Sequence, residues 1–156
     1  MSKCCSPDQN LVPPSVVRKR ICPHDGSEGK PVKLITLKSL LKAAALEQLD
    51  PLQFYSFCAS SDCSVVYFFE ASQSFTIADL KVPVFQKDTA EKVPVCYCFG
   101  WNRRRIREEI EQERISSVVA SITTHVKAKR CGCEVNNPQG SCCLANVRLV
   151  VEQAAE

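Results

Sequence analysis

The strongest constraint in this sequence is a set of cysteines gathered in its second half. Cys96-Tyr-Cys98 is followed by a long charged stretch, then by Cys133, then by a Pro/Gly turn and the adjacent pair Cys142-Cys143. Thiolates grouped in this way commonly hold iron–sulfur clusters, because iron in these clusters takes sulfur ligands in tetrahedral geometry. The spacing therefore predicts an iron–sulfur site. A structural zinc ion is the alternative, because four cysteines suit zinc equally well.

Composition points to a metal-binding protein rather than a disulfide-bonded one. Eleven of the 156 residues are Cys, and the net charge of +3 is modest. The segment Met1–Cys5 does not open an apolar signal sequence, and no apolar run approaches the roughly 20 residues needed to span a bilayer. We therefore expect a cytoplasmic protein without membrane insertion, in which clustered cysteines indicate metal ligands.

The pattern along the chain predicts an α+β protein in two parts that follow a flexible tail. The tail, residues 1–20, contains chain-breaking prolines and the pair Cys4-Cys5, for which free thiols and capture of Cu(I) are alternatives. Residues 21–90 are expected to form a small zinc-bearing β-rich part. The elements predicted there are a strand at 31–36, a helix over 37–49, and strands at 54–58, 64–69 and 74–77.

Residues 93–156 are expected to form a helical part that carries the clustered cysteines. An extended segment delivers Cys96, and Asn102 is placed to cap the first helix. The helices predicted there lie at 103–114, from 116 or 117 to about 129, and from about 141 onward. Because two antiparallel helices return the chain close to its starting point, we expect them to bring Cys98 and Cys133 together.

A run of arginines opens the first of these helices, at a helix end that disfavours cations. An oxidised all-Cys [2Fe–2S] centre carries about two negative charges, which such a run could offset. The alternative is that the arginines pair with glutamates four residues further on. The residues concerned are Arg103, Arg104, Arg105 and Arg107, with Glu108, Glu109 and Glu111. Because acidic residues follow at once, we expect no nucleic-acid binding.

Three further cysteines in the first part of the chain form a candidate metal site. Cys58 and Cys63 lie on either side of a turn between two predicted strands and can converge on one ion. Cys22, in a knuckle-like Cys-Pro turn, supplies a third thiolate. The alternative is a small core of reduced cysteines, because Cys is often buried without a metal.

Several motifs resemble the N-terminal domain of the copper chaperone CopZ family, and together they span the chain from Ile21 to about Arg148. In the second part they are Cys96-Tyr-Cys98-Phe-Gly-Trp101, Ile106-Arg-Glu-Glu-Ile110, Cys133 and Asn137-Pro-Gln-Gly-Ser-Cys142-Cys143. In the first part they are Cys22-Pro23, Gly29-Lys-Pro-Val32 and the stretch from Phe57-Cys58 through Cys63 to Phe68. The second part by itself resembles [2Fe–2S] domains of the bacterioferritin-associated ferredoxin type.

The resemblance implies a [2Fe–2S] cluster in the second part, a mononuclear zinc in the first and a connection to copper. By position in the family motifs, the resemblance implies that Cys96, Cys98 and Cys133 are cluster ligands. We favour Cys143 over Cys142 as the fourth ligand. Cys131 has no counterpart in the family pattern and is either an alternative ligand or a spare thiol.

For zinc, the resemblance implies Cys22, Cys58 and Cys63. The family often has Cys-Pro-x-Cys where this chain has Cys22-Pro-His24-Asp25. Asp25 therefore stands where a ligand is expected, and zinc accepts carboxylate oxygen. His24 is the alternative fourth ligand.

These features predict a metal-binding protein for one-electron transfer in copper handling, which would reduce Cu(II) to Cu(I) for a separate copper carrier. The expected partners are a copper ion or copper-carrying protein and an electron donor, and copper binding would be transient. No phosphate loop or nucleophile–base pair points to an enzyme of the hydrolytic classes. The alternative function is a non-redox interaction module with structural zinc.

Overall fold

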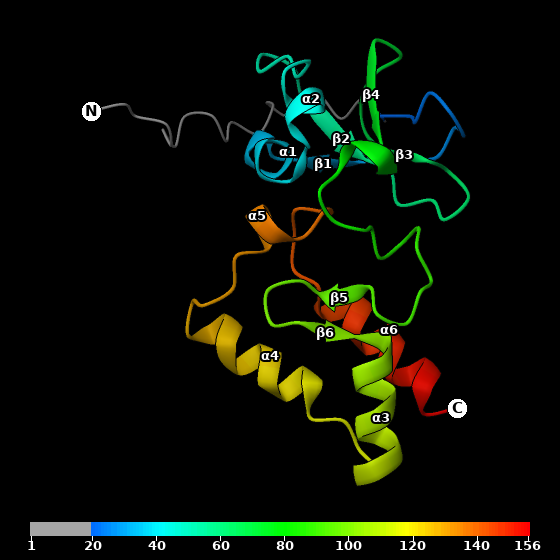
Figure 1. The fold of residues 1–156 in the computed structure, drawn as a ribbon, viewed down its shortest axis with the longest axis vertical. Coiled ribbons are helices and arrows are strands. Elements are labelled where there is room, and N and C mark those ends of the chain that lie inside the picture. Colours follow the sequence, from blue (N-terminus) through cyan, green and yellow to red (C-terminus); the bar gives the residue numbers. More distant parts are fainter. Residues whose placement is uncertain (1–19) are drawn as a thin grey trace.

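The computed structural model describes residues 20–156, so Cys4 and Cys5 lie outside the described residues. The fold is α+β, as predicted from the sequence. A small antiparallel sheet with two short helices lies at one end of the molecule and a group of longer helices at the other (Figure 1). We call these the sheet half (residues 20–84) and the helical half (residues 85–156).

The sheet half is built on four antiparallel strands in sequence order. They are β1 (Lys30–Val32), β2 (Tyr55–Phe57), β3 (Val65–Phe69) and β4 (Gln73–Thr76). The register places Phe57 opposite Tyr67, which confirms the predicted hairpin between the second and third strands. A 3-10 turn, η2 (Ile77–Asp79), follows β4. The strand predicted at 31–36 is too long, because a helix already begins at Leu34.

The helix predicted over 37–49 is divided into α1 (Leu34–Leu40) and α2 (Ala43–Leu46). The helix is divided because its backbone pairs with a segment that is distant in sequence. The amide of Lys42 donates to the carbonyl of Asp79 at 2.8 Å, and the amide of Lys81 donates to the carbonyl of Leu40 at 2.8 Å. Pairing with the segment after β4 therefore outweighs the helical periodicity at this point.

Each half has its own buried core. The core of the sheet half includes Leu37, Tyr55, Val66 and Tyr67, and the core of the helical half includes Val95, Ile106, Ile122 and Val147. The change from one core to the other falls between Val84 and Phe85, because Val84 packs in the first and Phe85 in the second.

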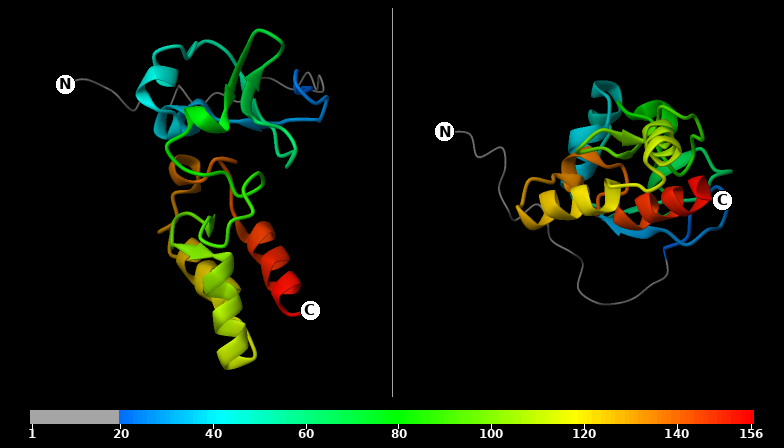
Figure 2. Two further views of the ribbon diagram at one scale, coloured as in Figure 1. Left: turned by 45° about the vertical axis from the view of Figure 1, so that its right-hand side comes forward. Right: turned by 90° about the horizontal axis from the view of Figure 1, so that it is seen from below.

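The helical half begins with a small hairpin and continues into three longer helices. The elements are β5 (Pro94–Cys96), β6 (Trp101–Asn102), α3 (Arg103–Glu113), α4 (Val118–Lys127) and α6 (Leu144–Ala154). The side chain of Asn102 accepts a hydrogen bond from the amide of Arg105 at 2.8 Å, so the predicted cap is confirmed. Helix α6 packs against both α3 and α4 (Figure 2).

A one-turn helix that sequence analysis missed, α5 (Cys133–Asn136), lies between the halves and packs against α1 (Figure 1). The hydroxyl of Thr36 donates to the carbonyl of Glu134 at 2.6 Å, and the side chain of Glu134 pairs with Lys33 at 2.5 Å. Nearby, the hydroxyl of Tyr67 donates to the carbonyl of Pro138 at 2.6 Å. The segment from Cys133 to the turn before α6 is therefore held by the sheet half. None of the helices within residues 20–156 has the length and apolar character of a membrane span.

Candidate metal centres

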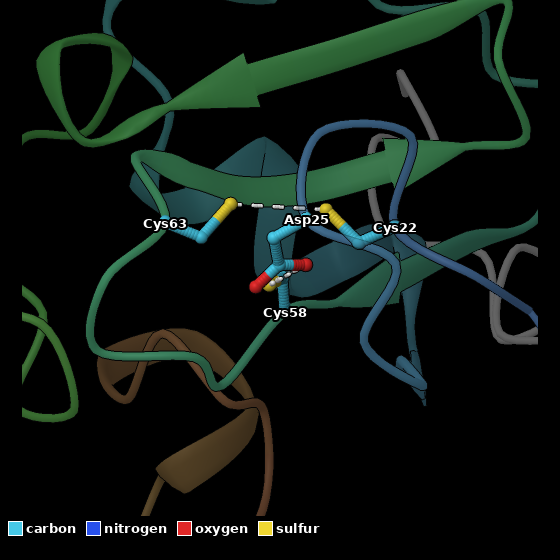
Figure 3. A group of neighbouring side chains, drawn as sticks. All are labelled: Cys22, Asp25, Cys58 and Cys63. Carbon is cyan, nitrogen blue, oxygen red and sulfur yellow. Dashed lines mark hydrogen bonds between the residues drawn. The ribbon is translucent and has the colours of Figure 1, made fainter.

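The first candidate centre lies at one end of the sheet, where two loops meet. Cys22 sits in a tight turn in which its amide donates to the carbonyl of Ser27 and its carbonyl accepts from Gly26. Gly26 adopts a φ of +75°, a conformation that favours glycine. Cys58 follows β2 directly, and Cys63 lies just before β3. Figure 3 shows the side chains of these three cysteines and of Asp25 gathered at one place.

The spacing of these four side chains suits a single tetrahedral ion. The ligand atoms of Cys22, Asp25, Cys58 and Cys63 all lie within 4.8 Å of one another. The sulfurs of Cys22 and Cys63 are 3.8 Å apart. A tetrahedron with zinc–sulfur bonds of about 2.3 Å has sulfur–sulfur edges of about 3.8 Å, so this pair already has the separation that zinc requires. All three cysteines are buried, while Asp25 is exposed and closes the outer side of the group.

The structure brings Asp25 into this group and leaves His24 beside it. Oδ1 of Asp25 accepts hydrogen bonds from the amide of Ser27 at 3.0 Å and from its hydroxyl at 2.7 Å. These bonds hold the pKa of the Asp25 carboxyl below its usual range, so the carboxylate is ionised and can act as a ligand. Nδ1 of His24 lies 3.4 Å from the sulfur of Cys63, close enough to serve as the alternative.

The charge balance of the first centre involves a lysine from outside the sheet. Burial raises the pKa of the Cys22 thiol to about 12, so a metal ion must displace a proton there. Burial also tends to raise the pKa of the Cys58 thiol. Hydrogen bonds and the charge of Lys87 outweigh this effect, so the pKa of Cys58 is lowered. The ammonium group of Lys87 donates to the carbonyls of Ser60 at 2.7 Å and Cys63 at 2.8 Å. Lys87 thus supplies positive charge next to a group that would be anionic with zinc bound.

The second candidate centre lies in the helical half, where four cysteines from distant positions converge. Cys96 ends β5, Cys98 follows in the turn before β6, Cys133 begins α5, and Cys143 immediately precedes α6. The sulfurs of Cys98 and Cys133 are 3.8 Å apart, so the chain returns to its starting point as predicted. Cys143 shifts the pKa of both Cys96 and Cys133 and therefore lies near them. Cys96 and Cys143 are buried, and Cys98 and Cys133 are half-buried.

Burial favours Cys143 over Cys142 as the fourth member of the group. Cys143 is 2% exposed and shifts the pKa of both Cys96 and Cys133, whereas Cys142 is exposed. Cys131 is half-buried, and burial raises the pKa of its thiol.

The surroundings of the second centre shift the pKa values of its four thiols in different directions. Hydrogen bonds from Cys143 lower the pKa of Cys96 to about 7 and that of Cys133 to about 6. The pKa of Cys143 itself is raised, and burial raises the pKa of Cys98. The amide of Gly132 donates to the sulfur of Cys98 at 3.2 Å. Amide donors of this kind stabilise ligand thiolates and tune the potential of a bound cluster.

The two candidate centres differ in how closely their ligand atoms approach. Among the described residues, only the group of Cys22, Asp25, Cys58 and Cys63 has all its ligand atoms within 4.8 Å of one another.

The arginines that open α3 have structural partners. Arg104 pairs with Glu108 at 2.8 Å, and Arg107 pairs with Glu91 at 2.6 Å and Glu111 at 3.8 Å. The structure therefore supports the ion-pair alternative for these two arginines. Two further contacts involve cations over aromatic rings: Arg103 lies over Phe85 at 4.2 Å, and Arg105 lies over Trp101 at 3.7 Å.

Sequence analysis missed the groups that support the ligands. They are Ser27, Lys87 and Gly132, together with His125, which stacks on Phe99 next to Cys98 at 4.6 Å between ring centroids. Apart from the bond of Ser27 to nearby Asp25, their partners are distant in sequence or belong to the backbone, so no local pattern marks them.

Comparison with known proteins points to one family. The profile of the CopZ zinc-binding domain, described as a zinc binding domain, matches residues 19–81. The copper chaperone CopZ of Archaeoglobus fulgidus is 34% identical over 122 residues, which cover 78% of this chain and 57% of that protein. The X-ray structure of the Archaeoglobus fulgidus CopZ N-terminal domain matches with a TM-score of 0.70 and 30% identity, over 83% of this chain and 96% of that one. The chain thus spans little more than half the length of the curated relative.

Proposed function

Because this chain belongs to the family of the CopZ N-terminal domain, we propose that it handles copper with the help of two resident metal centres. One is a zinc ion in the sheet half, and the other is a [2Fe–2S] cluster in the helical half. The observation that carries the proposal is the convergence of Cys98 and Cys133, whose sulfurs lie 3.8 Å apart although the residues are separated by two helices.

The zinc ion has a structural role in this proposal. Cys22, Cys58 and Cys63 hold it through sulfur, and Asp25 completes the tetrahedron through oxygen. These residues tie the first turn of the described chain to the loop between β2 and β3. Binding an ion to such loops fixes the end of a sheet whose strands contain only three to five residues.

The [2Fe–2S] cluster, when bound, supplies reversible transfer of one electron. Cys96, Cys98, Cys133 and Cys143 hold it in the proposal. Their roles differ with depth: Cys96 and Cys143 anchor the inner side, and the half-buried Cys98 and Cys133 face the outer side. The amide of Gly132 stabilises the outer sulfur of Cys98.

Copper is the substrate in this proposal. The chain is similar to a protein named a copper chaperone, and thiolate-rich sites suit copper in its reduced state. We assign to this chain the reduction of Cu(II) to Cu(I), with one electron per ion supplied by a separate donor. The Cu(I) is then passed to a copper-carrying partner.

The proposal is tested on protein purified without oxygen. We expect a red-brown protein with two acid-labile sulfides, two irons and one zinc per chain, whose colour bleaches with dithionite. Cys143→Ser should lose the sulfide and the colour, while the matched control Cys142→Ser should keep both. A colourless wild-type protein with two zinc ions per chain would instead support the non-redox interaction module.

A further inference from the structure

A cationic face lies beside the outer side of the second candidate centre and takes no part in ligand binding. It is formed by the C-terminal end of α4 and the residues that follow it, namely Lys127, Lys129 and Arg130. We propose that this cationic face docks an acidic electron-carrier protein, which supplies one electron to the second centre. The inference rests on the proposed function, because it takes that centre as the site of a [2Fe–2S] cluster.

Short contacts place the end of α4 against the loop of Cys98. The rings of Phe99 and His125 stack at 4.6 Å between centroids, and Phe99 directly follows Cys98. The guanidinium of Arg130 lies 3.2 Å from Nδ1 of His125, and the amide of Arg130 donates to the carbonyl of His125 at 3.0 Å. The amide of Gly132 then donates to the sulfur of Cys98 at 3.2 Å. The chain from His125 to Gly132 therefore begins and ends beside Cys98, which keeps its cations close to this ligand.

The same side of the centre is the accessible one. Cys98 and Cys133 are half-buried, whereas Cys96 and Cys143 are buried. A carrier protein that touches the half-buried side comes closer to the bound irons than one that touches a buried side. Val135, two residues after Cys133, is 41% exposed and offers an apolar contact next to the charges, as protein interfaces commonly do. In the proposed step one electron leaves the reduced carrier and converts one ferric ion to ferrous, and no covalent bond forms or breaks.

The charge of this face selects an acidic partner. Its three cations are exposed, and no carboxylate of residues 20–156 forms an ion pair with any of them. The nearest acidic residue after them in the sequence, Glu134, is already paired with Lys33 at 2.5 Å. By contrast, Arg104 and Arg107 of α3 have glutamate partners. Uncompensated positive charge attracts an acidic protein and speeds its association at low ionic strength.

The test uses flavodoxin, an acidic one-electron carrier, as the probe. Dye-labelled oxidised flavodoxin is titrated with the full, metal-loaded chain at low and high ionic strength, and binding is followed by fluorescence anisotropy. Stopped flow then measures how fast reduced flavodoxin bleaches the cluster. The face variant is Lys127→Glu/Lys129→Glu, and Lys127→Gln/Lys129→Gln makes half of that charge change. The matched control, Lys30→Glu/Lys42→Glu, makes the full charge change at two exposed lysines of the sheet half.

We expect the face variant to bind flavodoxin about 10-fold or more weakly than wild type at low ionic strength, because attraction becomes repulsion. Electron transfer from flavodoxin should slow by a similar factor, while dithionite still bleaches the cluster completely. The glutamine variant should show an intermediate loss. The control should stay within about 3-fold of wild type, and high salt should bring all the proteins together, because screening removes the charge effect.

Three results would overturn the inference. They are equal losses in the face variant and the control, a wild-type protein that does not bind flavodoxin, and a duplex DNA oligonucleotide that binds the cationic face when flavodoxin does not. Failure of the proposed function is a separate result, namely wild-type protein without acid-labile sulfide. The anisotropy titration does not require the cluster, so it would still show whether the face recognises an acidic protein.

Discussion

The hydroxyl of Tyr67 connects the sheet half to the ligand-bearing turn through one buried hydrogen bond. It donates to the carbonyl of Pro138 at 2.6 Å, and both residues are buried. Pro138 belongs to the turn that leads to Cys142 and Cys143. Tyr67→Phe removes the donor and leaves the carbonyl of Pro138 without this partner in the interior.

The structure sets the expected size of the effect. A buried acceptor that loses its donor costs about 1–3 kcal/mol, and the hydroxyl leaves only a small void behind. We therefore expect Tyr67→Phe to lower the free energy of unfolding by about 1–3 kcal/mol at neutral pH. Because the turn carries Cys143, the variant should also release the proposed cluster faster when a chelator is added.

The same hydrogen bond predicts that the stability of the protein depends on pH. Burial raises the pKa of Tyr67 above its ordinary value, because the folded state holds the neutral hydroxyl. The corresponding stability is fully present below the pKa of an unfolded tyrosine, about 10, and is lost as the pH rises above it. The phenylalanine variant lacks this titration, so the difference in stability between the two proteins should shrink above about pH 10.

Urea unfolding followed by Trp101 fluorescence, on metal-loaded protein, measures the first effect, and loss of visible absorbance in a chelator measures the second. Tyr55→Phe is the matched control. The hydroxyl of Tyr55 bonds to Gln73 and to the backbone of Asp50, all within the sheet half. Tyr55→Phe should lower the free energy of unfolding without changing the rate of cluster release. A loss below about 0.5 kcal/mol in Tyr67→Phe, with a release rate equal to the control, would refute the reasoning.

Three further predictions concern ligand choice, packing and a helix cap. Asp25→Ala should weaken zinc binding by about 10- to 100-fold or more in a competition with a zinc chelator, and His24→Ala should not; the reverse order would make His24 the ligand. Gly140→Ala should lower the unfolding temperature more than Gly100→Ala. Both glycines have positive φ, but a Cβ at Gly140 meets Thr36 and Val32 at 2.9 Å while one at Gly100 meets nothing within 4 Å, so equal losses would argue against a packing cost. Asn102→Ala should cost about 1 kcal/mol in urea unfolding and Asn102→Asp much less, because Asp can cap the same helix.

Local chemistry made part of this structure predictable. Asn102 precedes apolar residues at helical spacing, so the start of α3 could be placed from sequence. The strands around Cys58 and Cys63 are rich in aromatic and β-branched residues, so they could be placed as well. Helix α5 is one turn long and has no period to detect. The break between α1 and α2 depends on Leu41 pairing with Leu80, a contact that no local pattern records.

The candidate ligands were predictable to a similar degree. The cysteines were visible as clustered residue types. The structure groups Cys22, Asp25, Cys58 and Cys63, and it places the sulfurs of Cys98 and Cys133 3.8 Å apart. The choice between Cys142 and Cys143 required knowledge of burial, because the two are adjacent and chemically identical. The outer partners, such as Lys87 on the Cys63 carbonyl, depend on how the two halves meet.

The connection between the halves has a mechanical consequence. The guanidinium of Arg103 donates to the carbonyls of Phe85 at 3.1 Å and Asp88 at 3.0 Å, while Lys87 reaches back to the loop of Cys63. Two cations thus fasten the connecting backbone from both directions, so it is not a hinge. The interval between the two candidate metal centres is set by the fold, and a protease that cleaves loose connectors should find this one a poor substrate.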